Sequence, residues 1–233
     1  MVDDPGRPTE AVGVALPAEG WAGEVAEGAD RFGALVLGPG LGRFEGVRAA
    51  VADAVARVER PLVIDGDGLA ALTGLMVPPR GWPGLRVLTP HDGEFRSLTG
   101  RPPGPDRLAE ARSLAADTGC VVVLKGPTTV VAEPGGLALV VTEGDERLAT
   151  AGSGDVLSGI IGALLAQQPT AGSADAGAAA RLVAAAAFLH GRAGRLGPAR
   201  GLVAGDLPGL LPQAVASLGA AVPAGARPGV AER

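Results

Sequence analysis

The stretch "TAGSGDVLSGIIGALL", residues 150–165, places two glycines and one acid directly before a long apolar run. The run predicts a buried helix over residues 153–167. Because Gly152 and Gly154 carry no Cβ, their backbone N–H groups can approach a ligand closely. Amides at the N-terminus of a helix favour an anion. The stretch therefore predicts a helix start that binds a phosphate group, with Asp155 beside it.

Short apolar segments alternate with amphipathic segments along the rest of the chain. We expect strands at residues 34–38, 61–65, 86–89, 121–125, 128–132 and 138–142. Further helices are expected between the first two strands, where valines recur at helical spacing from Val47 to Val58, and at residues 106–118, 176–195 and 204–218. Apolar strands linked by helices indicate an α/β fold with a mostly parallel sheet covered on both faces. The Gly and Pro turns within residues 121–142 predict an antiparallel edge.

The length of 233 residues suits one domain over residues 1–233. Residues 1–30 and 220–233 are polar, rich in Gly and Pro or weakly patterned, so we expect partial disorder there. No apolar stretch approaches the roughly 20 residues of a membrane-spanning helix. The start "MVDDPGRPTE" lacks the basic and apolar parts of a secretory signal. We therefore expect a cytoplasmic protein that does not bind a membrane.

The charge and the aromatic content argue against nucleic acid as a partner. The net charge is −5, aromatic residues make up 3% of the chain, and tyrosine is absent. An acidic chain is not drawn to a phosphate backbone, and few aromatic rings are available to stack on bases. The one cysteine, Cys120, lies in the apolar run "CVVVLKG" and is expected to be a small core residue.

Unusual residues follow four of the expected strands, in "VLGPGLGR", "IDGDGL", "LTPHDGEF" and "VLKGPTT". Ligands of open α/β sheets bind at the carboxyl ends of the strands, so these segments are expected to form one site. Familiar motifs do not fit: "GPGLG" lacks the third small residue of a dinucleotide fingerprint, and no GxxxxGK[ST] is present. "AGSGD" is not a nucleophile elbow, so Ser153 is interpreted as part of a helix cap. His91 and His190 are too far apart in sequence to suggest a dedicated zinc site.

Asp155 has two interpretations. Beside a bound phosphate it could take a proton from a substrate hydroxyl as that oxygen attacks phosphorus. Alternatively it complements the helix dipole, which contributes about 0.3 to 1 kcal/mol. The neighbouring glycines favour the first interpretation.

Five motifs, in order and spacing, resemble those of the ADP/ATP-dependent NAD(P)H-hydrate dehydratase family: "LVLGPGLGR", "PLVIDGDGL", "LTPHDGEF", "VVVLKGPTTVVA" and "ATAGSGDVLSGIIGALLAQ". "AAAAFLHGRAG" and "GLVAGDL" follow, so the resemblance covers residues 34 to 215. It implies a ribokinase-like, three-layer α/β/α fold. It also implies ADP- or ATP-dependent dehydration of the S-epimer of hydrated NADH or NADPH, with Mg²⁺, in a homo-oligomer.

The resemblance implies roles for individual residues. Asp155 matches the catalytic acid/base that also contacts the hydrated nicotinamide, and Gly40 and His91 match positions that line the hydrate pocket. The expected nucleotide-binding residues are Lys125, Gly126, Pro127, Thr128, Thr129, Gly152 and Gly154. Asp65 and Asp67 could hold Mg²⁺ through water or act as loop caps, and Glu94 could contact a metal-bound water or be a first-turn helix acid. No residue is assigned as a direct metal ligand.

Three departures from the family pattern bear on activity. Members usually carry a segment like "NPGMATGG" where this chain has "DERLATAG" from Asp145 to Gly152, in the loop that leads to Asp155. Members usually carry "HPGE" where this chain has "HDGE", so Asp92 adds a negative charge near the expected pocket. Only 33 residues precede Ala34, so we expect the first layer of the sheet and one wall of the hydrate pocket to be missing. Two alternatives to the dehydratase stay open: a ribokinase-like kinase of a small hydroxylated metabolite, and a degenerate nucleotide-binding homologue without catalysis.

Overall fold

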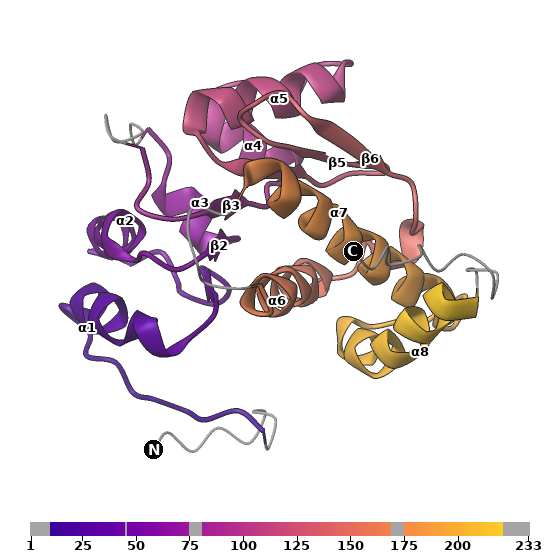
Figure 1. The fold of residues 1–233 in the computed structure, drawn as a ribbon, viewed down its shortest axis with the longest axis horizontal. Helices are drawn as coiled ribbons and strands as arrows, with labels where there is room; N and C mark the ends of the chain where they lie inside the picture. Colours follow the sequence, from indigo (N-terminus) through magenta and orange to yellow (C-terminus); the bar gives the residue numbers. More distant parts are fainter. Residues whose placement is uncertain (1–9, 45, 75–80, 169–174, 221–233) are drawn as a thin grey trace, which may run out of the picture.

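A six-stranded sheet forms the centre of the computed structural model, which describes residues 10–44, 46–74, 81–168 and 175–220 (Figure 1). The strand order follows the chain, β1-β2-β3-β4-β5-β6. β1 to β4 pair in parallel, and β5 and β6 are antiparallel to their neighbours, as the sequence predicted. The strands are β1 Leu35–Leu37, β2 Leu62–Ile64, β3 Arg86–Leu88, β4 Val121–Leu124, β5 Thr129–Ala132 and β6 Ala138–Val141.

Alternating side chains of the strands build two cores, one on each face of the sheet. On β2, Leu62 and Ile64 pack into one core and Val63 packs into the other. The first core is covered by α1 Trp21–Gly28, α2 Val47–Arg57, α3 Asp67–Ala71, α4 Asp92–Thr99 and α5 Arg107–Thr118. The second is covered by α6 Ser153–Ala166 and α7 Ala176–Leu196, with α8 Leu207–Ala220 packed on α7. This is the expected three-layer α/β/α arrangement (Figure 1).

The register of the parallel strands brings their carboxyl ends to one edge of the sheet. Ile64 lies opposite Leu88, and Leu88 lies opposite Val122. The backbone N–H of Lys125, just past β4, donates to the carbonyl of Pro90, just past β3, at 2.8 Å. The segments with unusual residues therefore meet at one place in the molecule.

Three short helices of the first face were not predicted from the sequence. α1 lies within the segment for which we expected partial disorder, yet its Trp21 is 6% exposed and packs in the first core. α3 and α4 span five and eight residues, too few to show a helical period. Residues 1–9 and 221–233, which were also expected to be partly disordered, lie outside the described residues.

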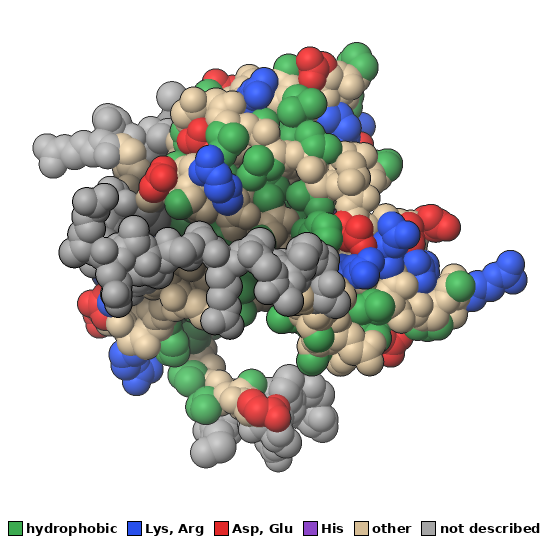
Figure 2. Space-filling view, turned by 45° about the vertical axis from the view of Figure 1, so that its right-hand side comes forward, with side chains coloured by type: hydrophobic (Ala, Val, Ile, Leu, Met, Phe, Trp, Pro, Cys, Tyr) green, Lys and Arg blue, Asp and Glu red, His purple; other side chains and the backbone are tan. Residues whose placement is uncertain are grey.

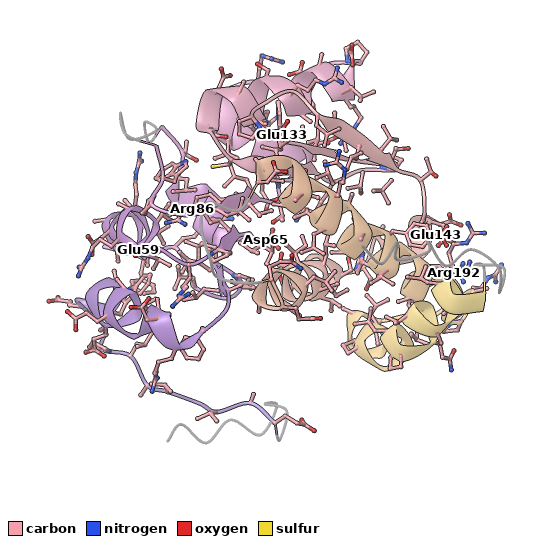
Figure 3. All side chains as sticks on the ribbon, in the orientation of Figure 1. Glu59, Asp65, Arg86, Glu133, Glu143 and Arg192 are labelled. Carbon is pink, nitrogen blue, oxygen red and sulfur yellow. The ribbon has the colours of Figure 1, made fainter. Side chains whose placement is uncertain are left out.

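Arg86, the first residue of β3, is 1% exposed, although arginine is rarely buried. Its guanidinium donates to the carbonyl oxygens of Val55 and Val58, where α2 ends, and to that of Arg60. Burial lowers its pKa to about 10, so the group is still charged at neutral pH. Figure 3 shows Arg86 at the end of the strands opposite to Asp65. It stabilises the end of α2, because cations are favourable beside free carbonyls at a helix C-terminus.

Three further expectations can be compared with the structure. Cys120 is buried at the start of β4, and burial raises its pKa to about 11, which fits an inert core residue. No helix in the described ranges is both long and apolar enough to cross a membrane. On the face in Figure 2, Lys and Arg side chains lie next to acidic ones and form no continuous basic stripe.

We predict opposite effects of two Gly→Ala substitutions. Gly38, at the end of β1, has φ 127°, and a Cβ there would overlap the carbonyl oxygen of Asp65. Gly38→Ala should therefore lower the free energy of unfolding by about 3 kcal/mol or more. Gly159, on the exposed side of α6, has no neighbour within 4 Å of an added Cβ. Gly159→Ala should stabilise the fold by about 1 kcal/mol in urea titrations. Equal midpoints for the two variants would contradict this account.

Candidate functional site

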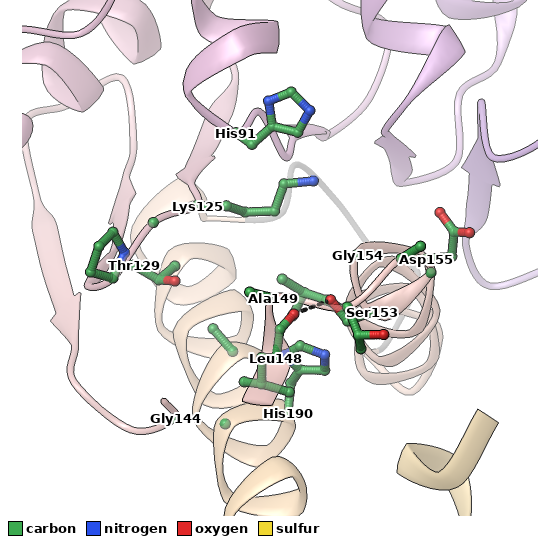
Figure 4. A pocket seen from close by; sticks show the side chains of 18 of the residues that line it. His91, Lys125, Thr129, Gly144, Leu148, Ala149, Ser153, Gly154, Asp155 and His190 are labelled. Carbon is green, nitrogen blue, oxygen red and sulfur yellow. Dashed lines mark hydrogen bonds between the residues drawn. The ribbon is translucent and has the colours of Figure 1, made fainter. Parts of the chain in front are cut away.

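A cavity of about 970 Å³ opens at the carboxyl edge of the parallel strands (Figure 4). Its lining comes from the ends of β2, β3 and β4, from the segment between β6 and α6, and from α7. The size suits a substrate or cofactor, since ligand cavities commonly range from about 300 to 1,000 Å³. Its position is where ligands of open α/β sheets bind.

The start of α6 forms one wall of the cavity, and no side chain caps it. Gly152, in the N-cap position, has φ 87°, a conformation that favours glycine. A Cβ on Gly154 would lie 3.3 Å from Nζ of Lys125 and 3.7 Å from Oδ2 of Asp65. The missing Cβ thus leaves room for the Lys125 ammonium beside the first turn of α6. The Lys125 ammonium and the free backbone N–H groups at the start of α6 are together suited to bind an anion.

Ser153 does not have the environment of a nucleophile. Its hydroxyl donates to the carbonyl of Leu148 at 2.6 Å, the bond dashed in Figure 4. This bond closes the turn from η2 Glu146–Leu148 into α6. The interpretation of Ser153 as a structural residue at the helix start is consistent with this geometry.

Lys125 is held by a network of buried and half-buried groups. Its Nζ lies 3.0 Å from Oδ1 of Asp65 and 3.6 Å from Oε2 of Glu94. Asp65 is 2% exposed, and its Oδ2 accepts a 2.7 Å hydrogen bond from the hydroxyl of Ser158 in α6. Burial alone would raise the pKa of Asp65, but the charge of Lys125 and the bond from Ser158 lower it. The carboxylate stays ionised and fixes Lys125 near the head of α6.

The segment from His91 to Glu94 is organised by a capping box at the start of α4. Nδ1 of His91 accepts from the backbone N–H groups of Gly93 and Glu94, at 3.0 and 3.1 Å. Glu94 returns the contact, accepting from the backbone N–H of His91 at 2.8 Å. Glu94 is therefore a first-turn helix acid, one of its two expected roles, and it also faces Lys125. His91 remains 59% exposed and lines the cavity.

Carboxylates outnumber cations in the cavity. Among the described lining residues, Lys125 is the one lysine and arginine is absent, whereas seven residues are acidic: Asp65, Asp92, Glu94, Glu143, Asp145, Glu146 and Asp155. A polyphosphate would need more positive charge than Lys125 supplies. Asp65 and Glu94 both approach Nζ of Lys125, so their oxygens converge near the anion site. No group of three or more His, Cys, Asp or Glu side chains that could hold a metal ion occurs in the described part.

His190 of α7 lines the cavity from below, and sequence reasoning assigned it no role (Figure 4). It is 7% exposed, and its Nε2 has no hydrogen-bond partner among the described residues. Burial lowers its pKa to about 4, and the positive charge of Lys125 acts in the same direction. The neutral imidazole presents a buried polar atom beside the expected nucleotide site. The "FLHG" motif alone gave no sign of this.

The cavity brings together eight of the expected site residues: His91, Lys125, Gly126, Pro127, Thr129, Gly152, Gly154 and Asp155. Gly40 and Thr128 do not line it, which differs from expectation. Gly40 follows the edge strand β1, and its loop is tied back by Asp67, which accepts from Arg43 Nε at 2.7 Å and Gly42 N at 2.9 Å. Asp67 thus acts as a loop-holding residue, not as part of the cavity.

The fold and the position of the cavity define a ribokinase-like protein. A ribokinase-like superfamily protein from Enterococcus faecalis has a TM-score of 0.68 and 25% sequence identity, covering 84% of this chain and 67% of that chain. The sequence model of the NAD(P)H-hydrate dehydratase family matches residues 10–216. The chain belongs to the NAD(P)H-hydrate dehydratase family, as its motifs indicated.

Two relatives have more specific descriptions. The bifunctional NAD(P)H-hydrate repair enzyme Nnr of Mycobacterium tuberculosis is 47% identical over 148 residues, which cover 64% of this chain and 31% of that protein. The ADP/ATP-dependent NAD(P)H-hydrate dehydratase of Bacillus subtilis, co-crystallised with ATP/Mg²⁺, is 33% identical with a TM-score of 0.68. That match covers 79% of this chain and 64% of the other. The chain spans about a third of the length of the curated relatives it matches.

We predict that His190 makes the protein less stable in mild acid. The unfolded chain binds a proton at this residue near pH 6.5, but the folded protein does so only near pH 4. The free energy of unfolding should therefore fall by about 3 kcal/mol as the pH drops from 6.5 to about 4, and it should be regained as the pH rises. The free energy of unfolding is measured by urea titration at several pH values from 4.5 to 7. It should change less with pH in His190→Gln than in the wild type. Parallel curves for the two proteins would show that His190 is not buried in its neutral form.

Proposed function

We propose that the chain catalyses the ADP- or ATP-dependent dehydration of the S-epimer of hydrated NADH or NADPH, a repair reaction. The observation that carries the proposal is the placement of Lys125 against the uncapped start of α6, with Asp155 on the same helical turn. This arrangement combines an anion site with a general base in one cavity. The names of the relatives from M. tuberculosis and B. subtilis support the choice of substrate.

The nucleotide is proposed to bind along the segment from Lys125 to Thr129 and at the first turn of α6. Lys125, Gly126, Pro127, Thr129, Gly152 and Gly154 line the cavity, and Thr128 lies in the same loop. The ammonium of Lys125 and the free amides of α6 would contact phosphate oxygens, and the hydroxyl of Thr129 could donate a further hydrogen bond. Co-crystallisation of the B. subtilis relative with ATP/Mg²⁺ supports a nucleotide in this family.

Mg²⁺ is proposed as the additional positive charge that the acidic cavity requires. The carboxylates of Asp65 and Glu94 converge near Lys125 and would hold the hydrated ion through its water molecules. When bound, the ion would neutralise charge on the phosphate oxygens. Within the protein, Ser158 keeps the carboxylate of Asp65 turned toward this point.

Asp155 is proposed to act on the hydroxyl of the hydrate. A hydroxyl group is a poor leaving group, but its phosphate ester leaves easily. Asp155 accepts the hydroxyl proton as the oxygen attacks the terminal phosphorus of the nucleotide. The bond from that phosphorus to its bridging oxygen breaks, so AMP leaves from ADP, or ADP from ATP. The C–O bond of the ester then breaks and phosphate departs with its electron pair. A ring proton on the neighbouring carbon passes to water, and the C–H electron pair forms the double bond that restores the dihydropyridine. His91, on the wall formed by α4, faces the same cavity and is proposed to contact the hydrate.

The same geometry would serve a kinase, because phosphoryl transfer to a hydroxyl is the first step of both reactions. The two functions differ in what happens to the acceptor.

The purified chain is mixed with hydrated NADH, Mg²⁺ and ADP or ATP, and the absorbance of the reduced nicotinamide is followed. The dehydratase restores this absorbance. A kinase consumes nucleotide only with another acceptor, and a degenerate homologue binds nucleotide without turnover.

Two substitutions should separate catalysis from nucleotide binding. Asp155→Asn should lower kcat by about 100-fold or more, because it removes the base, while the affinity for ADP changes little. Lys125→Met should instead lower the affinity for ADP by about tenfold or more, since it removes the cation of the anion site. Asp117→Asn, on the exposed side of α5, is the control. Full activity of Asp155→Asn would exclude the proposed base.

A further inference from the structure

Arg107, the first residue of α5, contacts two of the segments that line the cavity. Its Nη1 lies 2.8 Å from Oδ1 of Asp92 at the start of α4. Its Nη2 donates to the carbonyl oxygen of Lys125, also at 2.8 Å. One guanidinium therefore joins the segment that carries His91 to the loop that carries Lys125.

The same guanidinium packs directly against Gly126. A Cβ on Gly126 would lie 2.6 Å from Nη2 and 3.0 Å from Cζ of Arg107, closer than side-chain contacts allow. The planar group thus occupies the space beneath the loop that a larger residue at position 126 would need. Arginine is suited to this position because its planar guanidinium can donate hydrogen bonds to two different partners at once.

The location of Arg107 is not explained by the stability of its own helix. A cation in the first turn of a helix is unfavourable, because the free amides there carry positive partial charge. α5 already has a cap, since Oδ1 of Asp106 accepts from the backbone N–H of Ala109 at 3.0 Å. The buried residues Ala111, Leu114 and Ala115 fix the helix against the first core. Arg107 is therefore a cation on a rigid support that faces the cavity loops.

We propose that Arg107 is a positioning residue that fixes the Lys125–Thr129 loop relative to the start of α4 and so sets the affinity of the cavity for nucleotide. Arg107 acts through the loop, not by touching the nucleotide. The ion pair also explains how Asp92 is accommodated near the cavity: its charge is compensated by Arg107. The inference rests on the proposed nucleotide site, and it adds the residue that holds that site in shape.

The first test compares nucleotide affinity and turnover in matched variants. Arg107→Met should lower the affinity for ADP about tenfold in calorimetric titrations. The Lys125–Thr129 loop loses a charge-assisted hydrogen bond and the packing of the guanidinium against Gly126. KM for nucleotide should rise by a similar factor while kcat changes less than twofold. Arg107→Lys can reach only one of the two partners and should recover the affinity in part. Arg112→Met, on the exposed side of the same helix, is the control and should behave as the wild type.

Asp92→Ala separates positioning from simple charge. If Arg107 acted only as a positive charge near phosphate, removing the neighbouring carboxylate would tighten ADP binding. Positioning requires the opposite, because Arg107 loses one of its two anchors and the loop loosens. We expect about threefold weaker binding in Asp92→Ala, and less than additive loss when it is combined with Arg107→Met. Tighter binding in Asp92→Ala would overturn the proposal.

Hydrogen exchange of the free protein provides a measurement that does not depend on the reaction. Arg107→Met should speed exchange of backbone amides in both residues 91–94 and residues 125–129, and Arg112→Met in neither. Unchanged exchange, or equal ADP affinity in the two variants, would contradict the proposed role. A wild-type protein that binds ADP but restores no NADH absorbance would contradict the dehydratase activity alone, and the Arg107 comparison would still be decided by affinity and exchange.

Discussion

The placement of the Lys125 ammonium in the space that a side chain at Gly154 would occupy is the constraint on which the site depends. It needs a helix that begins without a side-chain cap, a glycine in its first turn, and a lysine that ends a neighbouring strand. The buried pair of Asp65 and Ser158 joins β2 to α6 and holds this arrangement in place. One ammonium and one set of amides face many carboxylates, and this excess of negative charge is the reason for proposing a ligand that brings a divalent cation together with its phosphate.

The sequence predicted the sheet and its larger helices well, because strong periodic patterns mark them. The six strands, the antiparallel edge and the helices that carry the second core all lie where the patterns indicated. α3 and α4 escaped prediction because they span only five and eight residues, and the capping box of His91 and Glu94 that starts α4 leaves no period in the sequence. Burial of Arg86 could not be predicted either, since its partners are backbone carbonyls more than 25 residues away.

In the candidate site, too, some features could be predicted from the sequence and others could not. The motif after β4 predicted the position of Lys125, and the glycine-rich helix start predicted the position of Gly154 and Asp155; all three line the cavity. Asp67 pairs with Arg43 and does not line the cavity, and the spacing of the residues in the sequence does not reveal this pairing between two loops. The unpartnered His190 also depends on how α7 packs against the start of α6. Family membership is the reason for the roles proposed for the motif residues, and the packing is the reason for those proposed for Ser158 and Arg107.

The most direct measurement of the central claim is a crystal structure of the protein soaked with ADP and Mg²⁺. We expect the terminal phosphate to lie between Nζ of Lys125 and the first amides of α6, with the carboxylate of Asp155 facing the open side of the phosphorus. A nucleotide whose phosphates lie elsewhere, with Lys125 still paired to Asp65 and the start of α6 empty, would contradict it.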